Sequence, residues 1–127
     1  MEEIIIRNAI VDDILQINDF EYFPVIVNCL KIKQLYPTTF VAESNGKVIG
    51  LLISEKSLLK NFDIKIIEVL PDYRKQGIGS MLINKLREIT NKKPITVYYP
   101  NKLEVQNFYK SNGFDIGDNI RTAILIE

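Results

Sequence analysis

Residues 69–82 read VLPDYRKQGIGSML, and this stretch decides how the rest of the sequence is interpreted. An apolar, β-rich run over Phe62–Leu70 leads into it, and apolar residues recur at helical spacing over residues 78–89. The stretch therefore predicts a strand, a glycine-bearing turn and a helix. Such an arrangement presents the free backbone N–H groups of a first helical turn, which bind phosphate well. Arg74 and Lys75 add positive charge to the turn.

Two common nucleotide-binding motifs do not fit this stretch. A P-loop requires GxxxxGK[ST], which the sequence does not contain. A dinucleotide-binding turn requires GxGxxG, but counting from Gly77 the third glycine position is Leu82, and no early βαβ unit precedes it. Gly77 and Gly79 are instead expected to let a pyrophosphate approach the backbone without interference from a Cβ atom.

The composition is that of an ordinary globular domain. The chain has 127 residues, of which 46% are hydrophobic and 25% charged, so we expect one domain over residues 1–127. Sixteen Lys and Arg residues balance sixteen Asp and Glu residues. A protein that binds nucleic acid by neutralising phosphates is usually more basic, so we expect no nucleic-acid partner.

Residue types that are absent or rare exclude several chemistries. The sequence contains no histidine, which excludes a Ser-His-Asp triad and a HExxH zinc site. Cys29 is the single cysteine, so neither an internal disulfide nor a thiolate metal cage can form, and we expect no metal. The N-terminus is acidic where a secretory signal is basic, and apolar runs such as Val48–Ile53 are too short to cross a bilayer. We therefore expect a cytoplasmic protein without a membrane partner.

Hydrophobic periodicity along the rest of the chain predicts both strands and helices. Asn45-Gly46 between two β-rich runs is a strong hairpin signal, because both residues tolerate a positive φ. Asn112-Gly113 predicts the end of a late helix. The expected fold class is α/β, or mixed α+β. The expected strands are residues 3–7, 38–43, 47–54, 62–70, 95–99, 114–116 and 122–126, and the expected helices are 12–20, 78–89 and 103–111, with one or two helical turns within 22–35.

Three segments together resemble one protein family. Residues 69–82 resemble the acyl-CoA signature of the GNAT N-acetyltransferase superfamily, V-x-P-x-[YF]-[RQ]-x-x-G-x-G-x-x-L. Residues 6–17 are similar to the family's opening segment, and residues 108–114, FYKSNGF, to its late FYxxxGF segment. The resemblance implies the GNAT fold, with a mostly antiparallel sheet of six to seven strands, splayed between the fourth and fifth, and three to four helices.

The resemblance also implies acetyl-CoA as the cosubstrate and a set of residues that bind it. Backbone groups around Glu68–Leu70 would pair with the pantetheine arm as an added strand, and N–H groups of Lys75–Ser80 would hold the pyrophosphate. Asn101 resembles an asparagine that contacts the cofactor, although it stands one residue farther from Tyr109 than is usual in the family. The implied cofactor-binding residues are Val69, Leu70, Arg74, Lys75, Gln76, Gly77, Ile78, Gly79, Ser80 and Asn101.

Two catalytic residues follow from the same resemblance. Tyr109 matches the tyrosine that donates a proton to the departing CoA thiolate, a role that suits a phenol with a pKa near 10. In several family members a glutamate on the fifth strand acts as the general base, and this chain has Val97 at that position. Glu68 is then the best candidate for the general base, with Tyr98 or Tyr99 as a holder of water.

The implied reaction is transfer of acetyl from acetyl-CoA to a primary amine, by direct attack in a ternary complex. The acceptor is left open between a small-molecule amine and a peptide or protein amine, and so is assembly as a homodimer. Family resemblance assigns specificity to residues 19–35 and 117–121. Asp19 and Glu21 in the first of these could attract a cationic acceptor or simply be solvated. The alternative function is a non-catalytic acyl-CoA-binding regulatory module on the same fold.

Overall fold

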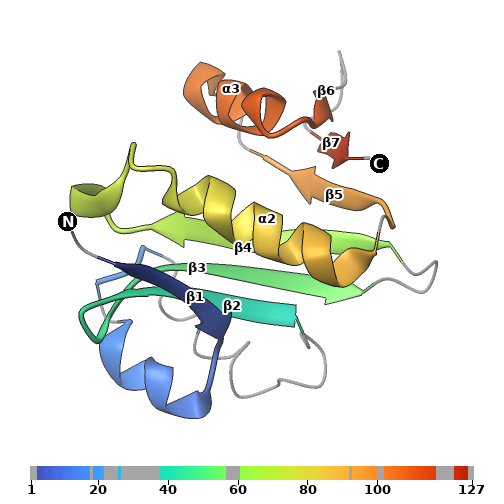
Figure 1. The fold of residues 1–127 in the computed structure, drawn as a ribbon. Helices are drawn as coiled ribbons and strands as arrows, with labels where there is room; N and C mark the ends of the chain where they lie inside the picture. The colour runs from blue at the N-terminus through green and yellow to red at the C-terminus, as the bar shows by residue number, and fades with distance from the viewer. Residues whose placement is uncertain are drawn as a thin grey trace.

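The protein is a seven-stranded sheet with helices on one face and the N-terminal segment on the other (Figure 1). No helix in the part of the chain described is both long and apolar enough to span a bilayer. The computed structural model describes residues 3–17, 19–21, 26, 38–56, 61–91, 93–99, 102–116 and 122–125.

The sheet is mostly antiparallel, as expected. Its strands lie in the order β1-β2-β3-β4-β5-β7-β6, and only β4 and β5 are parallel neighbours. This arrangement confirms the predicted α/β class and the predicted number of strands. The strands are Ile4–Asn8 (β1), Thr38–Ser44 (β2), Lys47–Lys56 (β3), Phe62–Val69 (β4), Ile95–Tyr98 (β5), Asp115–Ile116 (β6) and Thr122–Leu125 (β7).

Two α-helices and two 3₁₀ helices accompany the sheet in the described residues. The α-helices are Ile78–Thr90 (α2) and Leu103–Ser111 (α3), both close to the predicted positions. The 3₁₀ helices are Val11–Gln16 (η1) and Pro71–Tyr73 (η2). The helical turns expected within residues 22–35 lie outside the described residues, Ile26 excepted, and so does Cys29.

The helix expected over residues 12–20 is instead the shorter η1, because Asp13 ties its first turn to β1. The Asp13 N–H donates to the Ile10 carbonyl (3.0 Å), and the Asp13 carboxylate accepts from the Ile10 N–H (2.8 Å). The same carboxylate accepts from Arg7 Nη2 (2.8 Å), whose Nε donates to Glu43 (2.7 Å). The hydrogen bond with Asp13, and to a lesser extent that with Glu43, raises the pKa of Arg7 above its ordinary value.

The sheet separates two apolar clusters, which define its two faces. The first, on the helix face, contains buried residues of α2 (Ile78, Leu82, Ile83 and Leu86) packed on the sheet and on α3. The expected stripe on α2 is confirmed at Ile78, Leu82 and Leu86, whereas Met81 and Ile89 are exposed at its margins. The second, on the N-terminal face, contains residues of the N-terminal segment and of β2 and β3, together with Leu70 (Ala9, Ile17, Phe20, Ile26, Val41, Val48, Leu51, Ile53 and Leu70).

One extra residue in β4 changes the faces to which its side chains point. Ile53 pairs with Ile66 while Ser54 pairs with Ile64, so Lys65 is a β-bulge opposite β3. Ile64 belongs to the cluster on the helix face, and Ile66 packs against the cluster on the N-terminal face. Because alternation restarts after the bulge, Glu68 lies on the N-terminal face with Ile66.

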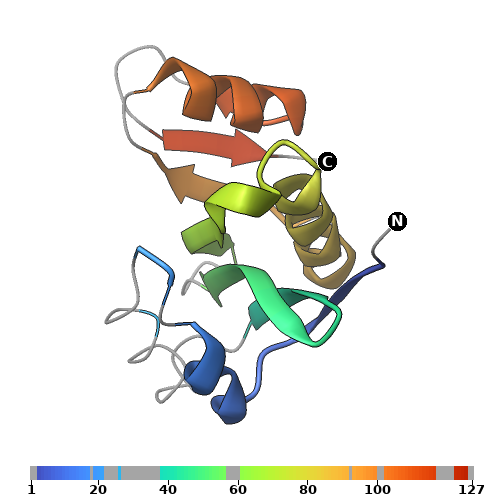
Figure 2. The ribbon, with the colours of Figure 1, turned by 90° about the vertical axis from the view of Figure 1, so that its left-hand side faces the viewer.

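The same position ends the pairing between β4 and β5. The two strands pair only over residues 62–64 of β4 and 95–97 of β5. Beyond the bulge the strands diverge, and Figure 2 shows β5 and β7 beside α3, apart from β1–β4. The sheet is therefore splayed between the fourth and fifth strands, as predicted.

The divergence leaves backbone groups of β4 without a partner strand among the described residues. The Leu70 N–H donates to the Ile49 carbonyl of β3 (2.9 Å). Alternate residues of an antiparallel strand direct their N–H and C=O groups to opposite sides. Ile67 and Val69 therefore direct theirs away from β3, toward the side from which β5 has diverged.

Candidate functional site

A tight turn connects the open end of β4 to α2. The Tyr73 N–H donates to the Leu70 carbonyl (2.9 Å), and Arg74 Nε donates to the Val69 carbonyl (2.8 Å). Lys75 and Gly77 both have positive φ, +64° and +81°. A left-handed conformation is unusual for lysine, so the turn holds its backbone in a shape that a free chain would seldom adopt.

The N-terminus of α2 has no capping side chain. Gly77 is the N-cap residue without a side-chain hydrogen bond, and the first turn contains no acidic residue. The N–H groups of residues 78–80 have no acceptor within the helix, which begins its ladder with Met81 donating to Gly77 (3.0 Å). The side chains of Arg74, Lys75 and Gln76 are exposed nearby. Free N–H groups, the helix dipole and two cations suit an anionic ligand.

Gly77 and Gly79 lack a side chain for different physical reasons. A Cβ atom on Gly77 would meet nothing within 4 Å, so Gly77 provides the positive φ and leaves space for an approaching group. A Cβ atom on Gly79 would lie 2.9 Å from Cε1 and Cζ of Phe108. The missing side chain of Gly79 therefore makes room for α3, a packing reason that the sequence did not reveal. Ile78 is 1% exposed in the core, so only its backbone is available.

Only some backbone groups at the end of β4 are available to pair with a ligand. Both backbone groups of Leu70 are engaged, with Ile49 and with Tyr73. The Val69 N–H and the backbone of Ile67 remain at the open edge. Sequence reasoning missed Ile67. The apolar-polar alternation of residues 62–65 breaks at Ile66-Ile67, and this break is the signal that could have indicated the bulge.

Tyr109, a residue of α3, lies in a buried group of aromatic side chains. Its ring centroid is 5.1 Å from that of Phe108, 5.3 Å from Phe114 and 5.9 Å from Tyr99. Burial raises the pKa of Tyr109 above its ordinary value near 10, so its phenol is neutral at physiological pH and is a weaker acid than a solvent-exposed tyrosine. Val69 packs against the same cluster, so Tyr109 and the end of β4 share one core.

Glu68 is a buried carboxylate on the N-terminal face. Its side chain is 7% exposed, and Oε2 accepts a hydrogen bond from the Glu21 N–H (2.7 Å). Tyr98 and Tyr99 alternate across β5 and its end, with Tyr99 2% and Tyr98 64% exposed. Tyr99 therefore belongs to the core, and Tyr98 is the more accessible of the two candidate holders of water. Asn101 lies outside the described residues.

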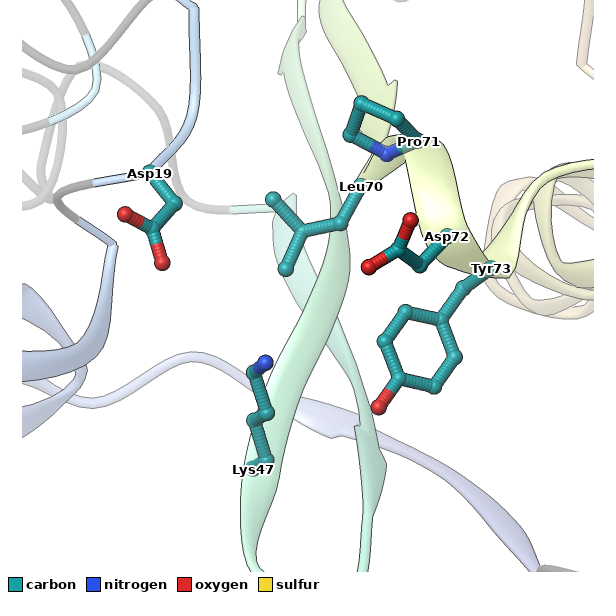
Figure 3. Close-up of a pocket in the computed structure, with 6 residues that line it drawn as sticks. All are labelled: Asp19, Lys47, Leu70, Pro71, Asp72 and Tyr73. Atoms are coloured by element: carbon teal, nitrogen blue, oxygen red, sulfur yellow. The ribbon is translucent and has the colours of Figure 1, made fainter.

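A half-open cavity of about 210 Å³ adjoins the end of β4 on this face (Figure 3). The carboxylates of Asp19 and Asp72 point into it from two sides, and the Lys47 ammonium points into it from a third. The ammonium lies 5.7 Å from the centroid of the Tyr73 ring. Within the described residues, no three His, Cys, Asp or Glu side chains form a group that could hold a metal ion. The lining residues are Asp19, Lys47, Leu70, Pro71, Asp72 and Tyr73.

Sequence comparisons connect this chain to acetyltransferases. Residues 36–116 match the family described as acetyltransferase (GNAT) domain. An uncharacterised N-acetyltransferase of Methanocaldococcus jannaschii is 36% identical over 87 residues, which cover 60% of this chain and 38% of that protein. The matched part of the chain thus spans well under half the length of this curated relative.

Comparison with solved structures shows the same fold. The PaiA N-acetyltransferase of Thermoplasma acidophilum, in complex with coenzyme A, is similar with a TM-score of 0.79 at 17% identity, over 98% of this chain and 99% of that one. The ribosomal-protein-S18-alanine N-acetyltransferase of Escherichia coli gives 0.80 at 17% identity, over 98% and 94%. A GNAT family acetyltransferase of Brucella melitensis, in complex with acetyl-CoA, gives 0.75 at 18% identity, over 99% and 89%.

The close contact of Gly79 with α3 predicts an unusual sign for one substitution. Replacing glycine by alanine inside a helix normally stabilises it by up to about 1 kcal/mol. Here we expect Gly79→Ala to lower the free energy of unfolding by roughly 1–2 kcal/mol, because the new methyl group displaces the Phe108 ring. Urea unfolding measures the change, and the same substitution in a Phe108→Leu background should cost less. An increase in stability from the single substitution would contradict this packing.

Proposed function

The chain belongs to the GNAT acetyltransferase family, and on that premise we propose that it transfers the acetyl group of acetyl-CoA to a primary amine. One observation carries the proposal. The open edge of β4 at Ile67 and Val69 leads directly through a glycine-bearing turn to the uncapped N-terminus of α2. Similar structures in complex with coenzyme A or acetyl-CoA support acetyl-CoA as the cosubstrate.

The residues present fit acetyl-CoA in two parts. The N–H groups of residues 77–80, with Arg74, Lys75 and Gln76, would hold the pyrophosphate, and the space beside Gly77 lets a phosphate approach. The pantetheine arm would then follow the edge of β4 as an added strand and meet the Val69 N–H first. Asn101 completes the proposed set of cofactor contacts.

The thioester would lie farther along the same edge, near Ile67. An arm that starts at the turn passes Val69 before Ile67, so the Ile67 N–H is the donor available to the thioester carbonyl. A backbone N–H at the developing oxyanion is worth a few kcal/mol in acyl transfer. This places the reacting carbonyl close to the bulge, where β4 and β5 begin to diverge.

The proposed step forms one bond and breaks one bond. The neutral amine nitrogen attacks the thioester carbonyl, a C–N bond forms and the C–S bond breaks, and the thiolate takes a proton from Tyr109. The attacking amine loses a proton to Glu68, directly or through a water held by Tyr98, whose position on the exposed side of β5 suits that task. The products are an amide and CoA.

The acceptor would approach from the N-terminal face. Leu70 lines the cavity there and follows Glu68 on the same side of β4. The proposal leaves open whether the primary amine belongs to a small molecule or to a peptide. Two carboxylates and the Lys47 ammonium point into the cavity, and the excess of one negative charge favours an acceptor with a second positive charge.

We expect acetyl-CoA and CoA to stabilise the protein against heat, and ATP and NAD not to do so. A ligand at a hundred times its dissociation constant adds about 2.7 kcal/mol, which corresponds to several degrees for a domain of this size. Thermal melts with each ligand measure the shift. A larger shift with ATP or NAD would contradict the proposed site.

Tyr109→Phe is expected to lower kcat roughly 10²-fold while acetyl-CoA affinity changes little, because only the proton donor is lost. Tyr99→Phe is a matched control, since it removes a hydroxyl from the neighbouring buried ring. Steady-state release of CoA measures kcat. Equal turnover of the two variants would remove Tyr109 from the mechanism. A protein that binds acetyl-CoA but shows no amine-dependent CoA release across a broad set of amines would instead be the regulatory module.

Glu68→Gln is expected to flatten the limb of the rate profile that rises with pH, because glutamine cannot accept the proton of the amine. Glu21→Gln is the control, since it neutralises a nearby carboxylate but keeps the backbone N–H that contacts Glu68. The dependence of kcat on pH is measured for both. An unaltered profile in Glu68→Gln would transfer the role of base to water or to another residue.

A further inference from the structure

A short N-terminal segment touches Glu68 from outside the sheet. Phe20 is 3% exposed within the cluster on the N-terminal face, and its N–H donates to the Ile17 carbonyl (3.1 Å). The next N–H along the chain, that of Glu21, donates to Oε2 of Glu68 (2.7 Å), although 47 residues separate the two in sequence. The contact is therefore built by an anchored piece of backbone and not by a mobile side chain.

We propose that Asp19–Glu21 is the positioning element for Glu68, with Phe20 as its anchor and the Glu21 N–H as its contact. The inference rests on the proposed function, because it gives Glu68 a task in acetyl transfer. A carboxylate that accepts a hydrogen bond from an anchored backbone N–H has a more restricted orientation than one on a side chain without that contact. An N–H donor also stabilises the ionised carboxylate, the form that accepts a proton.

The same segment reaches the cavity at the end of β4. Asp19 lines this cavity together with Leu70, which lies on the same face of β4 as Glu68. The segment thus presents the Asp19 carboxylate to the proposed acceptor and, two residues later, the Glu21 N–H to the proposed base. An acceptor that contacts Asp19 therefore binds against the element that orients Glu68.

Glu21→Pro and Glu21→Ala form a matched pair that tests this role. Both remove the same side chain, but only proline removes the N–H that contacts Glu68. We expect Glu21→Pro to lower kcat at neutral pH by roughly tenfold or more relative to Glu21→Ala, as for loss of a hydrogen bond to a charged group. The rising limb of its rate profile should move to higher pH, while the dissociation constant for acetyl-CoA stays within about twofold.

Comparison of Glu21→Pro with Glu21→Ala separates the effect of the Glu21 N–H from the effects of the charged residues around it. Asp19, Lys47, Asp72 and Tyr73 line the adjacent cavity and are the same in both variants. The Glu21 carboxylate is absent from both. A difference in pH profile between the two variants therefore comes from the backbone donor.

Two further measurements keep the test decisive. If Glu21→Pro does not fold, the α-hydroxy analogue of glutamate at position 21 replaces the N–H by an ester oxygen without constraining φ. NMR of the Glu21 amide proton tests the contact without turnover, since its resonance should move upfield in Glu68→Gln, where a neutral acceptor replaces the carboxylate.

The outcomes separate this inference from the function on which it rests. If Glu68→Gln changes the pH profile but Glu21→Pro behaves as Glu21→Ala, the positioning role is overturned and the base remains. If Glu68→Gln leaves the profile unchanged, the base itself is contradicted and the positioning role falls with it. A shifted profile in Glu21→Pro together with the shifted amide resonance supports the proposal.

Discussion

Lys65 adds one residue to β4 opposite β3, and the pairing of β4 with β5 stops at the same place. Both effects come from one local departure from regular sheet geometry. The extra residue turns Glu68 toward the N-terminal segment, and the lost pairing frees the backbone edge at Ile67 and Val69. The proposed binding edge and the proposed base thus depend on the same bulge, and neither would exist in a strictly regular strand.

Much of the fold could be predicted, because it depends on local patterns. The Asn45-Gly46 hairpin, the apolar stripe of α2 and the bounds of α3 are all short-range signals in the sequence. The bulge was not predicted, because the break in alternation at Ile66-Ile67 does not by itself specify the register with the neighbouring strand. The 3₁₀ form of η1 was also missed, because it depends on Arg7 reaching Asp13 and Glu43 across β1 and β2.

At the candidate site, the sequence showed which residues matter more readily than it showed what each of them contributes. The turn with Gly77 was correctly placed before a helix, and Gly77 has the positive φ that the turn requires. Gly79 looks the same in sequence, yet its neighbour is the Phe108 ring, a contact between residues far apart in the chain. The Glu21 contact with Glu68 has no sequence signal for the same reason, since a backbone donor leaves no mark on the residue type. Motifs thus identify which segments meet, whereas tertiary packing decides what each residue contributes.

The missing cap of α2 has a consequence for the proposed binding of an anion. The N–H groups of residues 78–80 have no acceptor within the helix, and yet α2 is helical from Ile78 onward. In the proposed complex a phosphate would replace water at these amides and meet a turn that already has its shape. The proposed binding step would therefore cost little ordering of the backbone.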